Sequence, residues 1–352
     1  MKNFSNPSSA RLNSRIQKDF RLRKQWLFLA CALEAWAHKP GNVHRERSFA
    51  DLEYLDFVRS ARAVAPSLAR AEGRTIGKVV LEAVRATRSA VGKNTNLGII
   101  LLLAPLSVLP LSVLAGSATA KGRRALRQRL ERELRRTNRG DAEAVYKAIR
   151  CASPGGLGSA ARGDVRDGPS GTLLEMMRLA RRRDLIALQY SNAFRQVITE
   201  GLPGIQRALS AGGSLEDAVI NCFLELLARH GDSLIARKTS PAVSRRAAQL
   251  ARRALDERRS RRKRGGRLAE LDAWLRSDGH RRNPGSCADL TAAVLFLALA
   301  GGIIPADLAA RTLGKDDAGP PSRRPARPAA RGRARSFSGR TSARWSRGEH
   351  HA

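Results

Sequence analysis

Apolar residues recur along most of this chain at intervals of three and four positions, the spacing that gathers them on one face of an α-helix. No run alternates Val, Ile, Thr or aromatic residues with polar ones between hairpin turns, as half-buried strands would. The pattern therefore predicts an all-α fold, a single large multi-helix domain with no internal repeat. The predicted helices cover residues 15–37, 50–71, 75–91, 97–117, 121–137, 141–152, 171–200, 214–229, 240–258, 267–277 and 287–300.

Two short motifs support the predicted helix starts. Ser214 precedes Asp217 by three positions in SLED, and Ser286 precedes Asp289 by three in SCAD. A serine followed three residues later by an acid resembles a capping box, in which each side chain satisfies a backbone N–H of the first turn. Both motifs predict that a helix begins at the serine.

Composition changes toward both ends of the chain. Residues 1–24 form a basic N-terminal leader, and residues 25–314 carry the helical pattern. From residue 315 onward, Phe337 and Trp345 are the only large apolar residues among Arg, Pro, Ser, Gly and Ala. Such a segment cannot bury enough surface to offset the entropy of ordering, so residues 315–352 are predicted to be a disordered basic tail rich in Arg and Pro.

Residues 94–120 contain no charged side chain and are long enough to cross a bilayer. Two structures remain open for this stretch, a membrane span or a hairpin buried in the core. Pro105 and Pro110 interrupt the apolar run and the polar sequence NTN opens it. We therefore expect a core hairpin, since fully buried helices are also apolar on all sides, and no membrane contact.

The formal net charge of +34 indicates an anionic partner, which can be a nucleic acid, an anionic lipid or a phosphorylated small molecule. Aromatic residues make up 5% of the chain, too few for a series of base-stacking platforms. Nucleic-acid contact is therefore expected only through the basic tail. The four cysteines are widely spaced and include no C-x-x-C pair, which favours a reducing, cytoplasmic location.

Five polar segments interrupt the helical pattern, and each combines turn formers with charged or amide groups. They are KPGNVHR (39–45), GKNTNLG (92–98), SPGGLGSAARGDVRD (153–167), HGDSLIARK (230–238) and RRNPGSCADL (281–290). Three of them place Gly or Pro-Gly near a helix start, where free backbone N–H groups and the helix dipole favour phosphate oxygens. Ordinary capping loops would explain each segment alone, whereas one pocket for a polyphosphate and a metal would explain all five.

Asp184 falls among the apolar positions of the helix predicted over residues 171–200. A carboxylate on the core side of a helix is costly unless it is paired. The sequence leaves two interpretations open: Asp184 pairs with an Arg, or it coordinates a cation in a pocket.

The polar segments, in this order, resemble the triphosphoribosyl-dephospho-CoA synthase family. The resemblance covers residues 30–305 and includes KPGNVHR, VGKNTNLGIILLLAPL, AIRCASPGGLGSAARGDVRDGPSGTLLEMMRLARRRDLIALQY, GDSLIARK and LDAWLRSDGHRRNPGSCADLTAAVLF. NTNLG and NPGSCADL are its most specific parts. It implies an all-helical pentosyltransferase that moves the triphosphoribosyl group of ATP onto the ribose 2′-hydroxyl of 3′-dephospho-CoA and expels adenine.

The resemblance also implies roles for individual residues. Displacement at the anomeric carbon benefits from an acid and a base, and a triphosphate needs cations and commonly Mg²⁺. The candidate catalytic residues are Asp164, Asp184 and Asp232, and the candidate Mg²⁺ ligands are Asp184 and Asp289. The candidate ATP- and substrate-binding residues are Lys39, Gly41, Asn42, His44, Arg45, Asn94, Thr95, Asn96, Gly98, Arg237, Lys238 and Asn283.

Two departures from the family pattern concern the acceptor. Members associated with citrate and malonate lyases follow the Pro-Gly motif with Gly-Ala-His and Asp-Met, whereas this chain has residues 43–47, VHRER, leading to Phe49. They also carry a His-Lys pair where this chain has Asn96 and Leu97. The chain therefore resembles a divergent branch. The alternative functions are the same donor chemistry on a different acceptor in the biosynthesis of a one-carbon carrier cofactor, or a basic helical nucleic-acid-binding protein.

Overall fold

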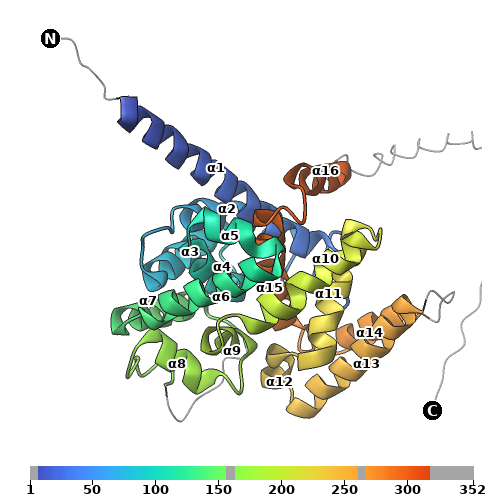
Figure 1. Cartoon of the computed structure of the whole chain (residues 1–352). Helices are drawn as coiled ribbons and strands as arrows, with labels where there is room; N and C mark the ends of the chain where they lie inside the picture. Colours follow the sequence, from blue (N-terminus) through green and yellow to red (C-terminus); the bar gives the residue numbers. More distant parts are fainter. Residues whose placement is uncertain (1–6, 156–162, 261–265, 318–352) are drawn as a thin grey trace, which may run out of the picture.

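The computed structural model describes residues 7–155, 163–260 and 266–317. These residues form helices around one hydrophobic core, with two isolated β-bridges, His44 to Arg47 and Phe49 to Leu52, and no strand (Figure 1). The predicted all-α fold is therefore confirmed.

The helices are α1 (Pro7–Trp36), α2 (Tyr54–Ala69), α3 (Ile76–Val91), α4 (Leu97–Ser107), α5 (Leu111–Ala115), α6 (Ala120–Arg135), α7 (Arg139–Ala152), α8 (Leu173–Ala180), α9 (Leu185–Ser191), α10 (Leu202–Ser210), α11 (Leu215–His230), α12 (Ser233–Lys238), α13 (Pro241–Arg259), α14 (Arg267–Arg276), α15 (Gly285–Ala300) and α16 (Ala306–Asp317). A 3₁₀ turn covers Gly116–Ala118, and a π-helix covers Gln196–Gly201.

Two predicted helices are broken in the structure. The helix expected over residues 97–117 bends after Ser107 into α4, α5 and the 3₁₀ turn, because Pro110 cannot continue the hydrogen-bond ladder. The helix expected over residues 171–200 divides into α8, α9 and the π-helix, with Ala193 and Phe194 at positive φ between the last two. The short helices α10, α12 and α16 were not predicted.

The predicted boundaries and caps differ from the structure in detail. Helix α1 crosses the leader boundary placed at residue 24, and α16 includes the first three residues of the predicted tail; the rest of that tail lies outside the described residues. Ser214 accepts a hydrogen bond from the Asp217 N–H, as expected. The start predicted at Ser286 is wrong, because α15 begins at Gly285 with Pro284 in the N-cap position, and the Ser286 hydroxyl lies 2.8 Å from that of Ser233.

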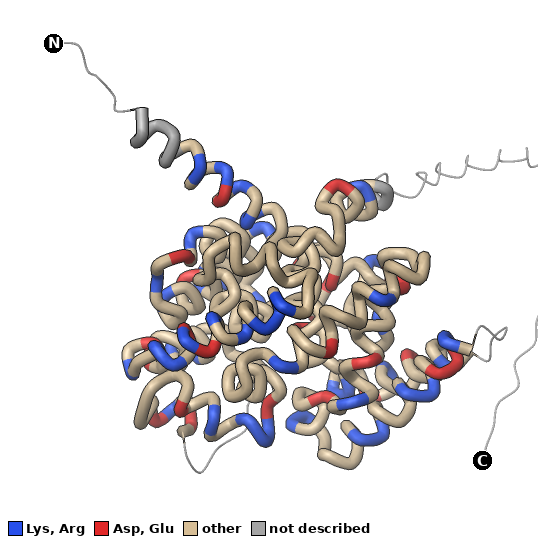
Figure 2. Tube along the Cα trace, in the orientation of Figure 1, with Lys and Arg blue, Asp and Glu red and all other residues tan. Residues whose placement is uncertain are grey.

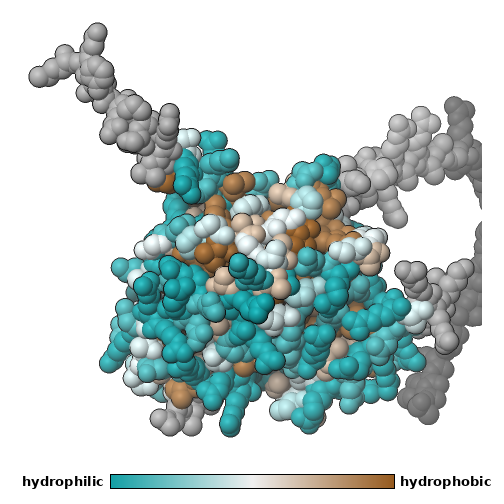
Figure 3. Space-filling model, in the orientation of Figure 1, coloured by the Kyte–Doolittle hydropathy of each residue, from teal (hydrophilic) through white to brown (hydrophobic). Residues whose placement is uncertain are grey.

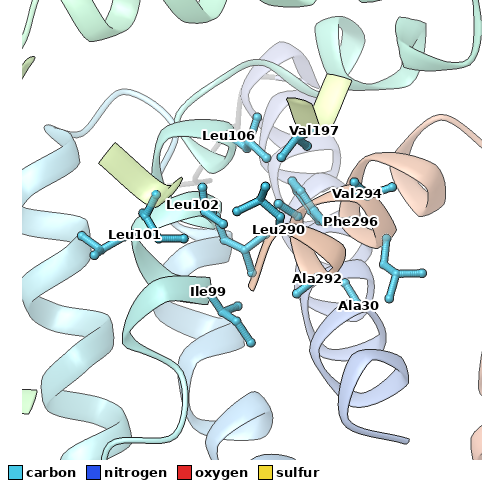
Figure 4. Close-up of a cluster of buried hydrophobic side chains, with 14 of the residues drawn as sticks. Ala30, Ile99, Leu101, Leu102, Leu106, Val197, Leu290, Ala292, Val294 and Phe296 are labelled. Carbon is cyan, nitrogen blue, oxygen red and sulfur yellow. The ribbon is translucent and has the colours of Figure 1, made fainter. Parts of the chain in front are cut away.

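Helix α15 runs through the centre of the molecule and packs against α1, α4, α10, α11 and the π-helix. Every residue from Leu290 to Ala300 is buried, as expected of a helix that is apolar on all sides. Figure 4 shows its side chains Leu290, Val294 and Phe296 among those of α1 and α4. This rigid core fixes the first turns of α4 and α15 relative to each other.

Helix α4 is buried from Ile99 through Ser107, as predicted for the first half of residues 94–120, whereas in α5 only Leu114 is buried. The buried Arg23 side chain donates to the carbonyl groups of Ser107 and Leu109, 2.7 and 2.8 Å away, where the helix ends. Of the described helices, none taken singly has the length and apolarity of a membrane span; only the pair Leu97–Ser107 and Leu111–Ala118 does together, and it is bent by 105°.

Charged residues lie around the outside of the helical body. Figure 2 shows Lys and Arg on most of the helices, with fewer Asp and Glu. Figure 3 shows a mostly hydrophilic face, on which hydrophobic side chains gather around α5 and the base of α16. The four cysteines, Cys31, Cys151, Cys222 and Cys287, are all free.

Candidate active site

A cavity of about 670 Å³ opens beside the first turns of α4, α9, α12 and α15. It brings together residues from all five polar segments. The predicted site residues that line it are Asn42, Asn94, Thr95, Asn96, Gly98, Asp184, Arg237, Lys238, Asn283 and Asp289.

The NTN turn before α4 is held by its own side chains. Asn94 accepts a hydrogen bond from the Leu97 N–H (3.3 Å), and the Thr95 and Ser60 hydroxyls lie 2.6 Å apart. The buried Asn96 accepts from the Thr87 hydroxyl at 2.9 Å, while its Nδ2 has no hydrogen-bond partner. A buried donor without a partner is costly, so this amide is well suited to bind a ligand oxygen.

The absence of a side chain at Gly98 leaves room for the Asp289 carboxylate. A Cβ atom at residue 98 would lie 1.9 Å from Asp289 Oδ2, far inside van der Waals contact. Only glycine therefore lets the first turn of α4 approach α15 so closely. No hydrogen bond or ion pair engages the Asp289 side chain within the described parts of the chain. Burial, with Glu34 and Asp232 nearby, raises the pKa of Asp289 well above its ordinary value.

Asp184 lies at the break between α8 and α9, not on the face of a continuous helix. Its Oδ1 caps α9 by accepting from the N–H groups of Ile186 and Ala187, at 2.8 and 3.0 Å. Its Oδ2 accepts from Arg237, so the interpretation that Asp184 pairs with an arginine holds. Arg237 Nε remains without a partner. Asp184 thus holds the Arg237 guanidinium at the cavity wall.

Asp232 lies behind the wall rather than on it. Its carboxylate is almost fully buried and accepts from the N–H groups of Leu234, Ile235 and Cys287 at 2.8, 3.1 and 2.8 Å. Burial raises its pKa in spite of these three donors. Asp232 therefore joins the start of α12 to the start of α15, which positions Arg237, Lys238 and Asp289 together.

The segment KPGNVHR mainly builds the wall. Lys39 is fully buried beside Glu34, and the Gly41 N–H donates to Asp272 at 2.8 Å from a backbone with φ of 75°. The pKa of the buried His44 falls to about 4, chiefly because burial disfavours its charge. Arg45 lies over the Trp36 ring, 4.4 Å from its centroid. Of the predicted residues in this segment, only Asn42 reaches the cavity.

Asp164 also stays off the lining, although its neighbours Gly163 and Val165 belong to it. Its carboxylate is buried and pairs with Arg166 at 2.8 Å, with a further hydrogen bond to the Arg166 backbone N–H. The structure thus gives Asp164 the role of ordering this loop.

Several lining residues were not predicted. An apolar end of the cavity is formed by Val145, Tyr146, Ile149, Leu173, Met176 and Met177, from α7 and α8. Asp51 and His280 face each other at 3.3 Å where the side chains are more exposed. Glu34 lines the cavity from α1, and it is the one acid in the apolar run WLFLACALEAW. That isolated acid was a signal in the sequence, whereas the Met and Tyr residues look like ordinary core.

Comparisons with known proteins identify the family that this chain resembles. The sequence profile of the ATP:dephospho-CoA triphosphoribosyl transferase family (CitG) matches residues 21–305. A crystal structure of an Archaeoglobus fulgidus protein named as a triphosphoribosyl-dephospho-CoA synthase is 29% identical, with a TM-score of 0.52, over 70% of this chain and 99% of that one.

A curated Pseudomonas putida protein, named as a 2-(5″-triphosphoribosyl)-3′-dephosphocoenzyme-A synthase, is 35% identical over 116 residues. That match spans 33% of this chain and 41% of the relative, so less than half of the relative's length is matched. The family profile, in contrast, covers the chain from α1 through α15 and every segment that lines the cavity. The chain therefore belongs to the ATP:dephospho-CoA triphosphoribosyl transferase family.

Proposed function

We propose that this protein transfers the triphosphoribosyl group of ATP to the ribose 2′-hydroxyl of 3′-dephospho-CoA and releases adenine. The observation that carries the proposal is the convergence of the family-matched segments on one cavity. Both relatives bear names for this acceptor, which favours dephospho-CoA over a different acceptor. Nucleic-acid binding is not favoured, and residues 318–352 of the basic tail that would carry it lie outside the described residues.

The polar end of the cavity suits a triphosphate joined to a ribose. Arg237 and Lys238 supply positive charge, and Asn96 Nδ2 and Arg237 Nε are donors without partners. Asn283 Oδ1 is an acceptor without a partner, suited to a sugar hydroxyl. Charge-assisted hydrogen bonds to phosphate are the strongest of these contacts.

The apolar end suits a flat or unbranched organic group. Met176 and Met177 are adaptable, polarisable side chains that contact aromatic rings favourably. Tyr146 contributes an aromatic wall while its hydroxyl donates to the Gly163 carbonyl at 2.8 Å. We assign this end to the organic parts of the two substrates, the nucleobase or the pantetheine arm.

We further propose that Mg²⁺ accompanies the triphosphate. No group of three or more His, Cys, Asp or Glu side chains able to hold a metal occurs in residues 7–155, 163–260 and 266–317. Mg²⁺ commonly uses one or two carboxylates together with substrate phosphates, so a single free carboxylate fits. Asp289 is that carboxylate, whereas both Asp184 oxygens are already engaged. The ion would neutralise phosphate charge beside Asp289. Together with the free cysteines, the family suggests a cytoplasmic location.

Lys238 gives a test of donor binding. Its ammonium lines the cavity, lies 3.5 Å from the His280 carbonyl, and forms no ion pair with any described residue. Burial lowers its pKa, as expected of a cation that lacks a fixed counterion. We expect Lys238→Met to weaken ATP binding about 10- to 100-fold by calorimetry, the loss of one charge-assisted contact. Lys147→Met, at an exposed position of α7, is the matched control.

An unchanged ATP affinity in Lys238→Met, with the wild-type circular dichroism spectrum, would place the triphosphate elsewhere. The reaction itself is tested by product analysis of the purified protein with Mg-ATP and 3′-dephospho-CoA. We expect free adenine in amounts equal to the new acceptor product. Formation of ADP or phosphate without adenine would contradict the proposed function.

A further inference from the structure

Glu34 has a free carboxylate oxygen at the cavity wall. Its Oε1 lies 3.0 Å from Lys39 Nζ, and the same ammonium donates to the Glu34 backbone carbonyl. No hydrogen bond or ion pair engages Oε2 within the described residues, although the side chain is only 5% exposed. Glu34 lines the cavity, and Lys39 binds its Oε1. Its Oε2 is therefore the oxygen that remains for a substrate.

The other carboxylates on the lining are less able to take a proton from a substrate. Both oxygens of Asp184 are occupied by backbone N–H groups and Arg237. Asp289 is the carboxylate assigned above to the metal. The Asp51 side chain is 60% exposed and lies beside His280, where water competes for it. Glu34 is thus the lining carboxylate that is buried, oriented and unoccupied.

Lys39 owes its position to the Pro-Gly turn. The turn follows α1 directly, and the Gly41 N–H donates to Asp272, which fixes the turn against α14. This geometry folds the fully buried Lys39 side chain back onto the last turns of α1. A fully buried ion pair is a poor source of stability, so a location at a cavity wall indicates another use.

We propose that Glu34 is the general base for the acceptor hydroxyl and that Lys39 positions it. The assignment rests on the proposed transferase function. The acceptor O–H bond breaks and its proton moves to Glu34 Oε2. The oxygen then bonds to the anomeric carbon of ATP, the bond from that carbon to adenine breaks, and the electron pair leaves with adenine. Adenine takes up one proton from water, and Glu34 returns one to water.

The test compares Glu34→Gln with the wild type and with Glu143→Gln, an exposed position on α7. We expect Glu34→Gln to lower kcat at least about 100-fold, the usual contribution of a general base, with KM for ATP within about threefold. Glu34→Ala should be partly rescued by added formate, which can occupy the vacated space as a small base. Glu34→Asp, which keeps the charge, should retain more activity than Glu34→Gln.

A kcat of Glu34→Gln within threefold of wild type, or a raised KM with unchanged kcat, would overturn the assignment. An absence of adenine release by the wild type would instead refute the proposed function. Should Glu34→Gln fail to fold, Glu34→Ala decides: wild-type activity, or a reduced activity that formate leaves unchanged, contradicts the base.

A double-mutant cycle tests the positioning role of Lys39. We expect Lys39→Met to lower kcat about 10-fold or more in the wild type and to have almost no effect in Glu34→Gln, because the two residues act as a unit. Lys39→Arg should recover part of the activity. Equal losses in both backgrounds would mean that Lys39 acts independently of Glu34, and would overturn the positioning role.

Discussion

Gly98→Ala is expected to reduce turnover at least about 100-fold and to destabilise the protein, although alanine is the better helix former by about 1 kcal/mol. The added methyl group would lie 1.9 Å from Asp289 Oδ2 and 2.5 Å from its Cγ. Neither partner can easily move, because α4 is buried from Ile99 onward and α15 from Leu290 onward. Either the carboxylate rotates away from the cavity, or α4 shifts and displaces the NTN turn.

Gly314→Ala is the matched control, since a Cβ atom at that helical position meets nothing within 4 Å. It should leave kcat unchanged and slightly raise the melting temperature, as helix propensity predicts. Adenine release and thermal unfolding of the two variants provide the comparison. Wild-type turnover in Gly98→Ala would show that the close approach of α4 to Asp289 is not needed for function.

Asp289→Asn is expected to abolish turnover and, without substrates, to stabilise the fold at neutral pH. The pKa of Asp289 is raised well above 3.8 because the carboxyl is buried, with Glu34, Asp232 and Asp184 nearby. Such a group stabilises the protein fully below about pH 3.8, and this contribution is lost as pH rises toward the folded pKa. Asparagine keeps the shape and has no proton to lose.

Asp289→Asn should therefore become more stable than the wild type above about pH 4, and the difference in the free energy of unfolding should grow with pH. Denaturant unfolding at a series of pH values measures it. Turnover should fall at least about 100-fold. Loss of a residue that only hydrogen-bonds to a metal ligand already costs about 10- to 100-fold in metal affinity or activity, and Asp289 would be a ligand itself. A variant that is less stable than wild type at pH 7, or that turns over normally, would show that Asp289 is a structural residue.

Much of the fold could be predicted, because the spacing of apolar residues within a single segment is enough to indicate a helix. The buried helices α4 and α15 were recognised from uniform apolarity. The break at Asp184 was not recognised, since Arg181 to Arg183 continue an acceptable helical pattern and the apolar spacing hides the local cap that Asp184 forms on α9. The six-residue helix α12 is too short to show a period, and Asp232 specifies it through its N-cap.

The site was predictable where polar groups stand at helix starts, since buried helix starts converge on one cavity. Asn96 and Asp289 belong to this class, whereas Arg237 and Lys238 lie in the last turn of the short helix α12. Spacing alone does not tell which side of a turn faces the cavity. Lys39 and Arg45 flank the Pro-Gly turn, yet one folds back onto Glu34 and the other packs over Trp36. The apolar end was invisible in sequence because Met176 and Met177 also fit an ordinary core.

The measurement closest to the central claim follows the ribose of ATP. The purified protein is incubated with Mg²⁺, 3′-dephospho-CoA and ATP labelled with ¹³C in the ribose only, and the products are resolved by mass spectrometry. We expect the labelled ribose and all three phosphates to appear on the acceptor, with adenine released unlabelled. Labelled ribose still joined to adenine in ADP or AMP, or free labelled ribose triphosphate without an acceptor product, would contradict transfer of the triphosphoribosyl group by this protein.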